Sequence, residues 1–286
     1  MEQFIFENSL GNSITIDQNN DSTFFLQSYD GLTSSEIIPI TTTGYNQIGS
    51  KFIKNKIGIR LINISFQVYG ETMQDFYEQR RNLSSIFNPT LGEGVLTYQN
   101  DFINKSIDVS ISAMSYPTEK NGNLQLFTVE LIAHNPLWYD TELSGLKLDG
   151  FTGGLTFPLS IVNGGVILAE KGAVGNIEII GDVPSPILVE FRNSGTNPKL
   201  TNVTTGDFIQ INTIIDDNEK IIVNTAYGNK TVTFINIDGE ESSAYHLTSN
   251  DSKFFSLPMG LNKLSFEASG GMPEIYIYWR NWFLGV

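Results

Sequence analysis

The sequence predicts a mainly β protein of two β-sandwich domains, the first of which carries a single amphipathic α-helix. Its 286 residues exceed the length of about 150 that is typical of one domain. Only one segment repeats its apolar residues at helical spacing, whereas short alternating segments separated by turn signals fill the rest. We expect the domains to span residues 1–138 and 139–286.

Alternating strands open the first domain. Residues 3–8 and 13–17 form a predicted hairpin that turns at Gly11. In the strand 57–69, every second residue from Arg60 to Val68 belongs to the more apolar face, which is expected to meet the helix. Further strands are expected at 21–26, 37–38, 95–98, 103–114 and 124–133, and the domain closes at Trp138.

Residues 39–56 form a long, polar connection punctuated by glycine. It exceeds the loop length of about 12–15 residues beyond which a connection is usually functional or disordered. Two interpretations stay open: a mobile surface hairpin, or an arm that reaches a neighbouring subunit. In the second, the candidate contact residues are Gln47, Lys51, Lys54 and Lys56, whose lysines would meet an otherwise acidic surface.

The helix is expected at about 72–87. Its apolar residues step by three and four and so share one face: Met73, Phe76, Tyr77, Leu83, Ile86 and Phe87. Arg80 lies on the same stripe, where its methylenes can cover apolar surface while the guanidinium reaches solvent. Thr72 is the expected N-cap with Asp75 in the first turn, and Asn88 before Pro89 ends the helix.

The second domain shows short strands at regular spacing and no helical period, which is typical of an all-β sandwich. The glycine-rich residues 150–154 are interpreted as a linker. Strands are expected at 155–162, 174–181, 186–193, 206–212, 219–225, 231–237, 254–257, 261–268 and 274–283.

Charge and composition exclude several classes of function. The net charge is −14, with 8 basic and 14 acidic residues in 1–138 and 9 and 17 in 139–286, so no basic face for nucleic acid is expected. No apolar run reaches the ~18–20 residues of a membrane span. The N-terminus lacks the pattern of a signal peptide, so the protein is expected to stay in the cytoplasm where it is made.

No catalytic, cofactor-binding or metal-binding residue is predicted, so the protein is not expected to be an enzyme. The two histidines, His134 and His246, lie outside any zinc motif. No nucleophile elbow, P-loop or dinucleotide fingerprint occurs. The acidic turn 216–219 lacks the spacing of a calcium loop and is interpreted as a solvated hairpin tip.

An aromatic row near the C-terminus supports an alternative function. Alternation over residues 275–283 places four residues on one face: Tyr276, Tyr278, Arg280 and Trp282. Such a row could stack on sugar rings, as in a carbohydrate-binding module that anchors a tail or cell-surface particle to host cell-wall glycans. The other interpretation is a terminal strand that buries its opposite face, from Ile275 to Phe283, and uses the row for a subunit contact.

Several short segments follow one another in order along the first half: YEQRRNL (77–83), FNP (87–89), GEGVLTY (92–98), FTVEL (127–131) and AHNPLW (133–138). This ordered set resembles the distal tail protein (Dit), or phage tail component, family of siphophages that infect Gram-positive bacteria. Residues 177–191, 207–212 and 221–236 resemble the family's second, galectin-like or carbohydrate-module-like sandwich.

The resemblance implies a structural virion protein that forms a homo-hexameric ring at the tail tip through its first domain. As a baseplate hub, the ring would join the major tail tube protein to a tail-associated protein of the tail-fibre or lysin type and to a receptor-binding protein. The family's long extension embraces the next protomer, and residues 39–56 match it by position. Assembly would take place in the host bacterial cytoplasm, and tailocins use similar parts.

Overall fold

The computed structural model describes the chain except for residues 20, 34, 117–120, 150, 154–168, 172 and 272. The described residues form two compact units, residues 1–141 with 283–286, and residues 142–282. The last four residues were expected in the second domain and instead belong to the first unit. Among the described residues, no helix is long and apolar enough to span a bilayer. The mainly β architecture with its α-helix confirms the predicted fold class, although the sheet of the first unit, predicted as a sandwich, closes into a barrel.

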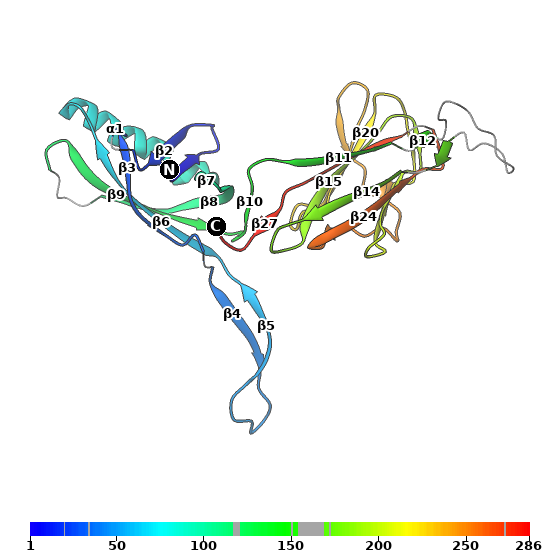
Figure 1. The fold of residues 1–286 in the computed structure, drawn as a ribbon, viewed down its shortest axis with the longest axis horizontal. Helices are drawn as coiled ribbons and strands as arrows, with labels where there is room; N and C mark the ends of the chain where they lie inside the picture. The colour runs from blue at the N-terminus through cyan, green and yellow to red at the C-terminus, as the bar shows by residue number, and fades with distance from the viewer. Residues whose placement is uncertain are drawn as a thin grey trace. The chain divides into compact units, whose positions relative to one another are not determined.

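The strands of the first unit close into a barrel (Figure 1). In the order β8, β7, β1, β2, β3, β6, β9, the last strand pairs with β8 again. The bounds are β1 (Gln3–Glu7), β2 (Ser13–Asp17), β3 (Phe24–Asp30), β6 (Arg60–Tyr69), β7 (Gly94–Gln99), β8 (Asn104–Ser115) and β9 (Leu124–Ala133). β8 is long enough to pair with β7 through its first half and with β9 through its second half. Two short strands extend the sheet beyond β8: β10 (Trp138–Asp140) and β27 (Trp282–Phe283).

Alternation places one face of each barrel strand in the core. In the β1–β2 hairpin, Phe4 lies opposite Ile16 and Phe6 opposite Ile14, and all four are buried. In β6, every second residue from Arg60 to Val68 is buried, as predicted, while the residues between them face outward. The core is therefore built by the face that the sequence pattern selects.

The helix α1 (Met73–Ile86) lies against β6 and begins and ends as predicted. The Thr72 hydroxyl accepts a hydrogen bond from the Asp75 N–H at 3.1 Å, which caps the first turn. Phe76, Leu83 and Ile86 are buried, and Phe87 stacks on Phe6 with ring centres 4.8 Å apart. The buried apolar stripe of the helix is shorter than predicted, because Met73 is 42% exposed and Tyr77 is 50% exposed. A short 3-10 turn, η1 (Pro89–Leu91), follows.

The second unit consists of two main sheets around its own core. One has the order β11-β26-β15-β20-β21-β22, with β23 beside β15, and the other has the order β14-β24-β17-β18. Phe191 of the first sheet contacts Phe266 of the second, with ring centres 6.2 Å apart. Two sheets that share an apolar core in this way form a sandwich.

The bounds of the elements of the second unit are as follows. The two main sheets contain β11 (Ser144–Asp149), β14 (Ala173–Ile179), β15 (Ser185–Arg192), β17 (Lys199–Asn202), β18 (Phe208–Gln210), β20 (Lys220–Asn224), β21 (Thr231–Ile235), β22 (Glu241–Ser243), β23 (Ser256–Leu257), β24 (Gly260–Glu267) and β26 (Glu274–Trp279). The smaller elements are β12 (Phe151–Gly153), β13 (Ala169–Lys171), β16 (Gly195–Thr196), β19 (Ile214–Ile215), β25 (Gly270–Gly271) and the 3-10 turn η2 (Tyr245–Leu247).

Several of these elements differ from the predicted ones. Of the strands in the two main sheets, β11, β17 and β22 were not predicted. The predicted strand 155–162 lies outside the described residues. The predicted linker 150–154 is described only at residues 151–153, where β12 pairs with β13. The predicted strand 274–283 is split, because β26 ends at Trp279 and Phe283 packs against the core of the first unit.

The helix cap provides a test of this local structure. We expect Thr72→Ala to lower the free energy of unfolding by about 1 kcal/mol, because the Asp75 N–H loses its acceptor. Urea unfolding followed by circular dichroism measures the change. Thr72→Ser keeps the hydroxyl and should restore the stability; equal stability of the alanine variant and the native chain would show that the cap contributes nothing.

Candidate assembly site

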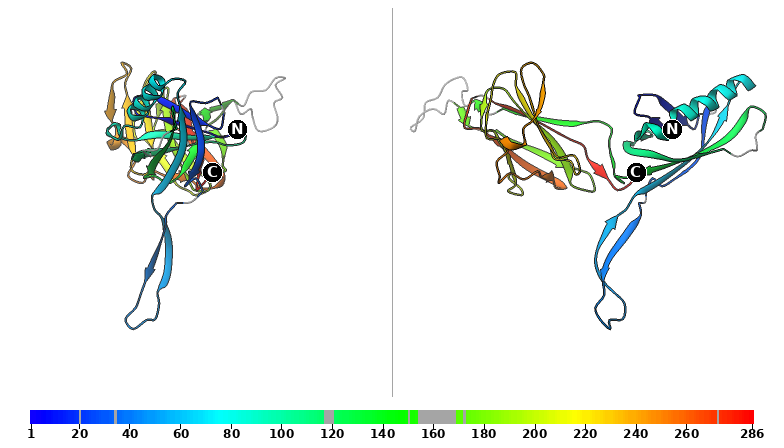
Figure 2. Two further views of the ribbon diagram at one scale, coloured as in Figure 1. Left: turned by 90° about the vertical axis from the view of Figure 1, so that its left-hand side faces the viewer. Right: turned by 180° about the vertical axis from the view of Figure 1, so that it is seen from behind.

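A two-stranded hairpin of β4 (Ile37–Thr42) and β5 (Lys51–Ile57) extends away from the barrel (Figures 1 and 2). We call residues 37–57 the arm. At its tip, Asn46 and Gly49 adopt positive φ values of 61° and 80°. The Gln47 side-chain oxygen accepts a hydrogen bond from the Gly44 N–H at 2.9 Å. Gln47, a predicted contact residue, therefore holds the tip in shape.

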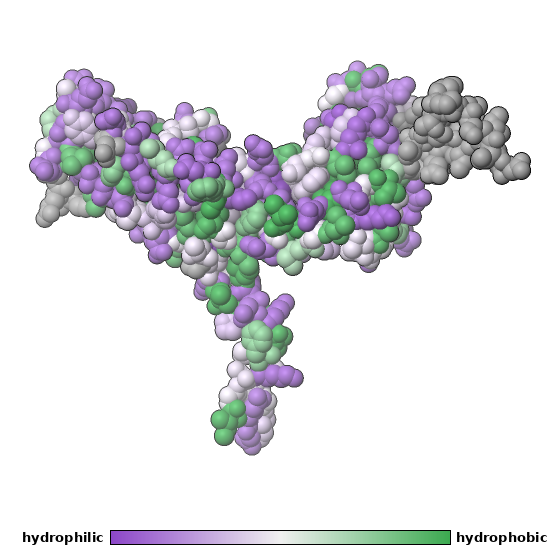
Figure 3. Space-filling view, viewed as in Figure 1, coloured by the Kyte–Doolittle hydropathy of each residue, from purple (hydrophilic) through white to green (hydrophobic). Residues whose placement is uncertain are grey.

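The arm is exposed along its whole length. Every arm residue except Ile40 is exposed, and apolar side chains are distributed from base to tip (Figure 3). Phe52 is 58% exposed and Tyr45 is 98% exposed. A two-stranded hairpin is at best marginally stable by itself in water, and contiguous exposed apolar side chains mark contact sites. These are the properties expected of a segment that a partner covers.

The strand register gives the arm two chemically different faces. Residues that are directly opposite in a ladder share a face, and neighbouring pairs alternate between faces. One face carries the pairs Ile37–Ile57, Pro39–Asn55 and Thr41–Phe52, and the other carries Ile38–Lys56, Ile40–Lys54 and Thr42–Lys51. The bulge between Ile40 and Thr41 preserves this division. The arm is thus neutral and apolar on one face and cationic on the other.

The arm also differs in charge from the rest of its unit. It contains three lysines and no acidic residue, whereas the remaining residues of 1–138 carry 5 basic and 14 acidic side chains. Opposite charges on two surfaces favour their encounter and fix their register. The lysine face is therefore complementary to the acidic body of an identical chain.

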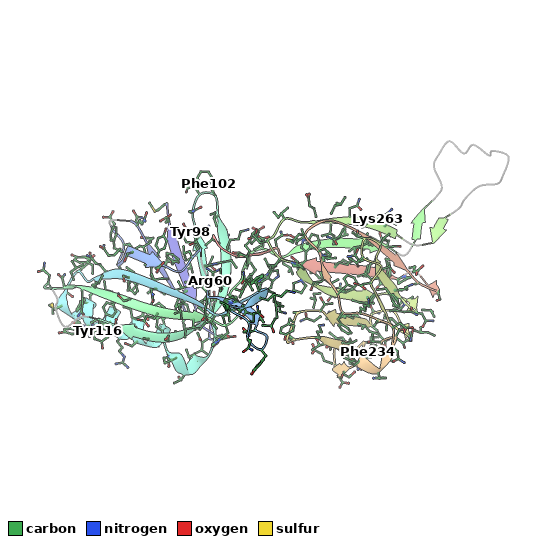
Figure 4. The ribbon with its side chains drawn as sticks, turned by 90° about the horizontal axis from the view of Figure 1, so that it is seen from below. Arg60, Tyr98, Phe102, Tyr116, Phe234 and Lys263 are labelled. Carbon is green, nitrogen blue, oxygen red and sulfur yellow. The ribbon has the colours of Figure 1, made fainter. Side chains whose placement is uncertain are left out.

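The base of the arm is fixed by a buried arginine. Arg60, three residues beyond β5, is fully buried and lies where the arm meets the barrel (Figure 4). Its Nη1 donates to the carbonyl oxygens of Gly31 at 2.8 Å and Leu32 at 2.7 Å, in the segment that leads into β4. Its Nε donates to the Pro136 carbonyl at 2.9 Å and its Nη2 to the Leu284 carbonyl. Removal from water lowers the pKa of Arg60.

Next to Arg60, two backbone segments pass close to each other, and the C-terminal residues of the chain are held at the same place. A Cβ atom on Gly31, whose φ is 91°, would lie 1.9 Å from the Leu61 carbonyl oxygen, so the chain can enter the arm here only through glycine. The Leu32 carbonyl also accepts hydrogen bonds from Trp138 Nε1 at 3.2 Å and from the Val286 N–H at 3.4 Å. Entry, exit and C-terminal tail thus meet at one point, which we call the Arg60 anchor.

The structure separates the four residues of the predicted aromatic row. Tyr276 and Tyr278 lie on one face of β26 with their rings stacked, their centres 6.5 Å apart. Arg280 follows the end of β26, and Trp282 belongs to β27. Only the two tyrosines therefore form the predicted row.

The other candidate groups stay apart. The His134 ring nitrogen lies 3.3 Å from the Ser110 hydroxyl, while His246 lies in the 3-10 turn η2. The acidic turn 216–219 is closed by its own backbone and side chains, as when the Asp216 N–H donates to the Glu219 carboxylate at 3.0 Å. The described residues contain no group of three or more potential metal ligands.

Sequence reasoning missed the Arg60 anchor, although one signal was present. Arg60 interrupts the apolar face of its strand, and a charged residue at a core position of an alternating pattern needs several internal acceptors. Those acceptors come from three separate segments of the chain, which periodicity alone does not bring together.

Two family models match the chain. The RIFT-related domain of phage tail proteins matches residues 10–133, and the C-terminal domain of siphovirus-type tail components matches residues 180–283. The fold is similar to that of the Dit protein of phage SPP1, described as a paradigm of the hub adsorption apparatus in phages infecting Gram-positive bacteria, with a TM-score of 0.64, 12% identity and coverage of 98% of this chain and 99% of that chain. It is also similar to a chain of the phage p2 baseplate in its activated conformation with calcium, with a TM-score of 0.59, 11% identity and full coverage of both chains. No curated protein sequence matches the chain significantly.

The anchor makes a prediction for stability. We expect Arg60→Ala to lower the free energy of unfolding by about 3 kcal/mol or more, because several buried carbonyl groups lose their donor. Hydrogen exchange should also rise at the Gly58 N–H, which donates to Glu36 at the arm base. The matched control is Arg81→Ala on the exposed side of α1, for which neither quantity should change. Unchanged exchange at Gly58 in Arg60→Ala would show that Arg60 does not hold the arm.

Proposed function

The chain belongs to the siphophage distal tail protein family, and from this premise we propose that it forms a homo-hexameric ring at the tail tip in which each arm embraces the next copy. The family and fold are those of a structural phage tail protein. A ring requires a heterologous contact, in which one surface of a protomer meets a different surface of its neighbour and the rotation closes. The arm supplies the first of these surfaces.

The observation that carries the proposal is the two-faced, exposed arm. Its apolar face, which includes Ile37, Phe52 and Ile57, would become buried on the neighbouring copy. Its cationic face would meet acidic side chains of that copy, whose chain carries a net charge of −14. A permanent interface buries about 2,000 Å² or more, which an extended arm helps to supply without enlarging the barrel.

A fixed arm direction supports the closed ring. Heterologous contacts build an open filament if the rotation between neighbours does not close. The Arg60 anchor joins both ends of the arm to the barrel through short hydrogen bonds, which limits the angle at which the arm leaves the barrel. The anchor therefore serves as a positioning element for the ring.

The ring would act as the baseplate hub. In this role, one side would contact the major tail tube protein, and the other the tail-associated protein of the tail-fibre or lysin type, with receptor-binding proteins at the periphery. The likeness to a chain of the p2 baseplate supports this placement. The ring would assemble in the host bacterial cytoplasm. Neither nucleic acid nor a membrane is a proposed partner.

Light scattering on a sizing column tests the ring and both faces of the arm. We expect the purified chain to have the mass of six subunits of 31.8 kDa, or of twelve if two rings stack. Reversing the charge of Lys51, Lys54 and Lys56 to Glu should shift the mass toward one subunit, because the lysine face would then repel the acidic copy. Phe52→Asp should do the same by placing a charge in the apolar contact.

The matched control reverses Lys230 and Lys263 to Glu, two exposed lysines of the second unit. We expect this variant to keep the mass of the native assembly. A native chain of one subunit at every concentration would contradict self-assembly into a ring. Native mass in both arm variants would show that another surface closes the ring.

A further inference from the structure

The outward face of the larger sheet in the second unit carries a compact polar and aromatic platform. Register places Tyr276 of β26 between Lys147 of β11 and Glu190 of β15, and Tyr278 between Gly145 and Leu188. The inward residues Ile275 and Ile277 are fully buried, so the two tyrosines face away from the core. We call this surface the tyrosine platform.

The rings of the platform are held in place by their neighbours, and both stay partly exposed. Tyr276 stacks against Tyr278 at 13° between ring planes, its hydroxyl donates to Glu274 at 3.1 Å, and the Arg192 guanidinium lies 4.7 Å from its ring centre. Tyr278 leans over Gly145, where a Cβ atom would lie only 3.3 Å from its ring. Gly145 has no side chain that could cover this flank of the ring, and Tyr278 stays partly exposed.

The charged groups of the platform are balanced. Glu190, only 7% exposed, pairs with Arg192 and with Lys220 at 3.6 Å. Lys147 pairs with Glu274 at 2.6 Å and with Asp149 at 3.1 Å, and the hydrogen bonds to these two carboxylates raise the pKa of Lys147. Three basic and three acidic side chains thus cancel on this face of a chain whose net charge is −14.

This chemistry selects a class of ligand. A partly exposed flat ring beside a glycine offers stacking to the C–H face of a sugar. Paired charges offer hydrogen-bond donors and acceptors at fixed positions, which suit hydroxyl groups. Preorganised side chains lower the cost of binding. A face without net charge neither attracts nor repels an ion, so it fits a neutral ligand better than an anionic one.

We propose that the tyrosine platform binds a neutral hexose unit of a glycan, with Tyr278 as the stacking residue and the Glu190–Arg192 and Lys147–Glu274 pairs as hydrogen-bonding partners. Glu190 is nearly buried and forms ion pairs with Arg192 and Lys220. Buried ion pairs add little to the stability of a fold on average. A role in ligand binding accounts better for these pairs. The site lies in the second unit and requires no residue of the arm, so it stands independently of the hexameric ring.

Saturation-transfer NMR on the full-length chain tests the site. The probes are glucose, galactose, rhamnose and N-acetylglucosamine, each added as the free sugar or its methyl glycoside. We expect at least one to bind with a dissociation constant on the order of 1 mM, a value typical of a small contact. Saturation should concentrate on the protons of one sugar face, because a stacked ring contacts one face.

Two variants identify the platform. Tyr278→Ala should weaken binding about tenfold or more, and Gly145→Val should weaken it similarly by covering this flank of the Tyr278 ring. Tyr278→Phe keeps the ring and should retain most of the affinity. Tyr227→Ala, which removes a fully exposed tyrosine from the turn between β20 and β21, should leave affinity unchanged. Thermal unfolding confirms that each variant is folded.

The outcomes decide the proposal in either direction. Loss of binding in Tyr278→Ala and Gly145→Val, with retention in Tyr227→Ala, supports a sugar site on the platform. Absence of binding by all four sugars overturns it and leaves a protein contact as the use of this face. Binding that survives in both platform variants also overturns it, because the sugar then lies elsewhere. Neither result bears on the mass measured for the ring.

Discussion

A single buried guanidinium holds together the part of the first unit from which the arm extends. Arg60 donates to carbonyl groups of the segment entering the arm, of the segment before β10 and of the C-terminal tail. A buried cation is costly unless it is well hydrogen-bonded, so these segments must converge for the barrel to fold. The direction of the arm is therefore tied to the formation of the core.

The closed barrel and the arm differ in whether their strand edges are free to pair with another chain. Unpaired strand edges invite uncontrolled association, and closure of a sheet removes them. In the described residues, β8 closes the barrel by pairing with both β7 and β9, whereas β4 and β5 pair only with each other. The arm thus combines unpaired strand edges with exposed apolar side chains, and its lysine face distinguishes between partners. This arrangement suits a protein whose contacts must form at a defined angle.

Local patterns predicted the elements of the first unit well, because hydrophobic period and capping act over a few residues. The cap at Thr72, the helix end before Pro89 and the buried face of β6 all follow from such patterns. Barrel closure, the return of Phe283 to the first unit and the Arg60 anchor depend on contacts between distant segments. The prediction that Arg280 and Trp282 continue the aromatic row was wrong for the same reason, because β26 ends at Trp279. The two faces of the arm and the charged pairs around Tyr276 depend on the register between paired strands, which the sequence alone does not give.

Cross-linking between copies tests most directly whether the arm reaches a neighbour. The chain contains no cysteine, so Gln47→Cys at the arm tip can carry a photo-cross-linker as the only thiol adduct. Assembly from equal amounts of ¹⁵N-labelled and unlabelled chains distinguishes contacts within a copy from contacts between copies. We expect tip cross-links to contain mixed isotopes and to join the arm to the first unit of another copy. Cross-links of uniform isotope composition would contradict it, because the arm would then contact only its own chain.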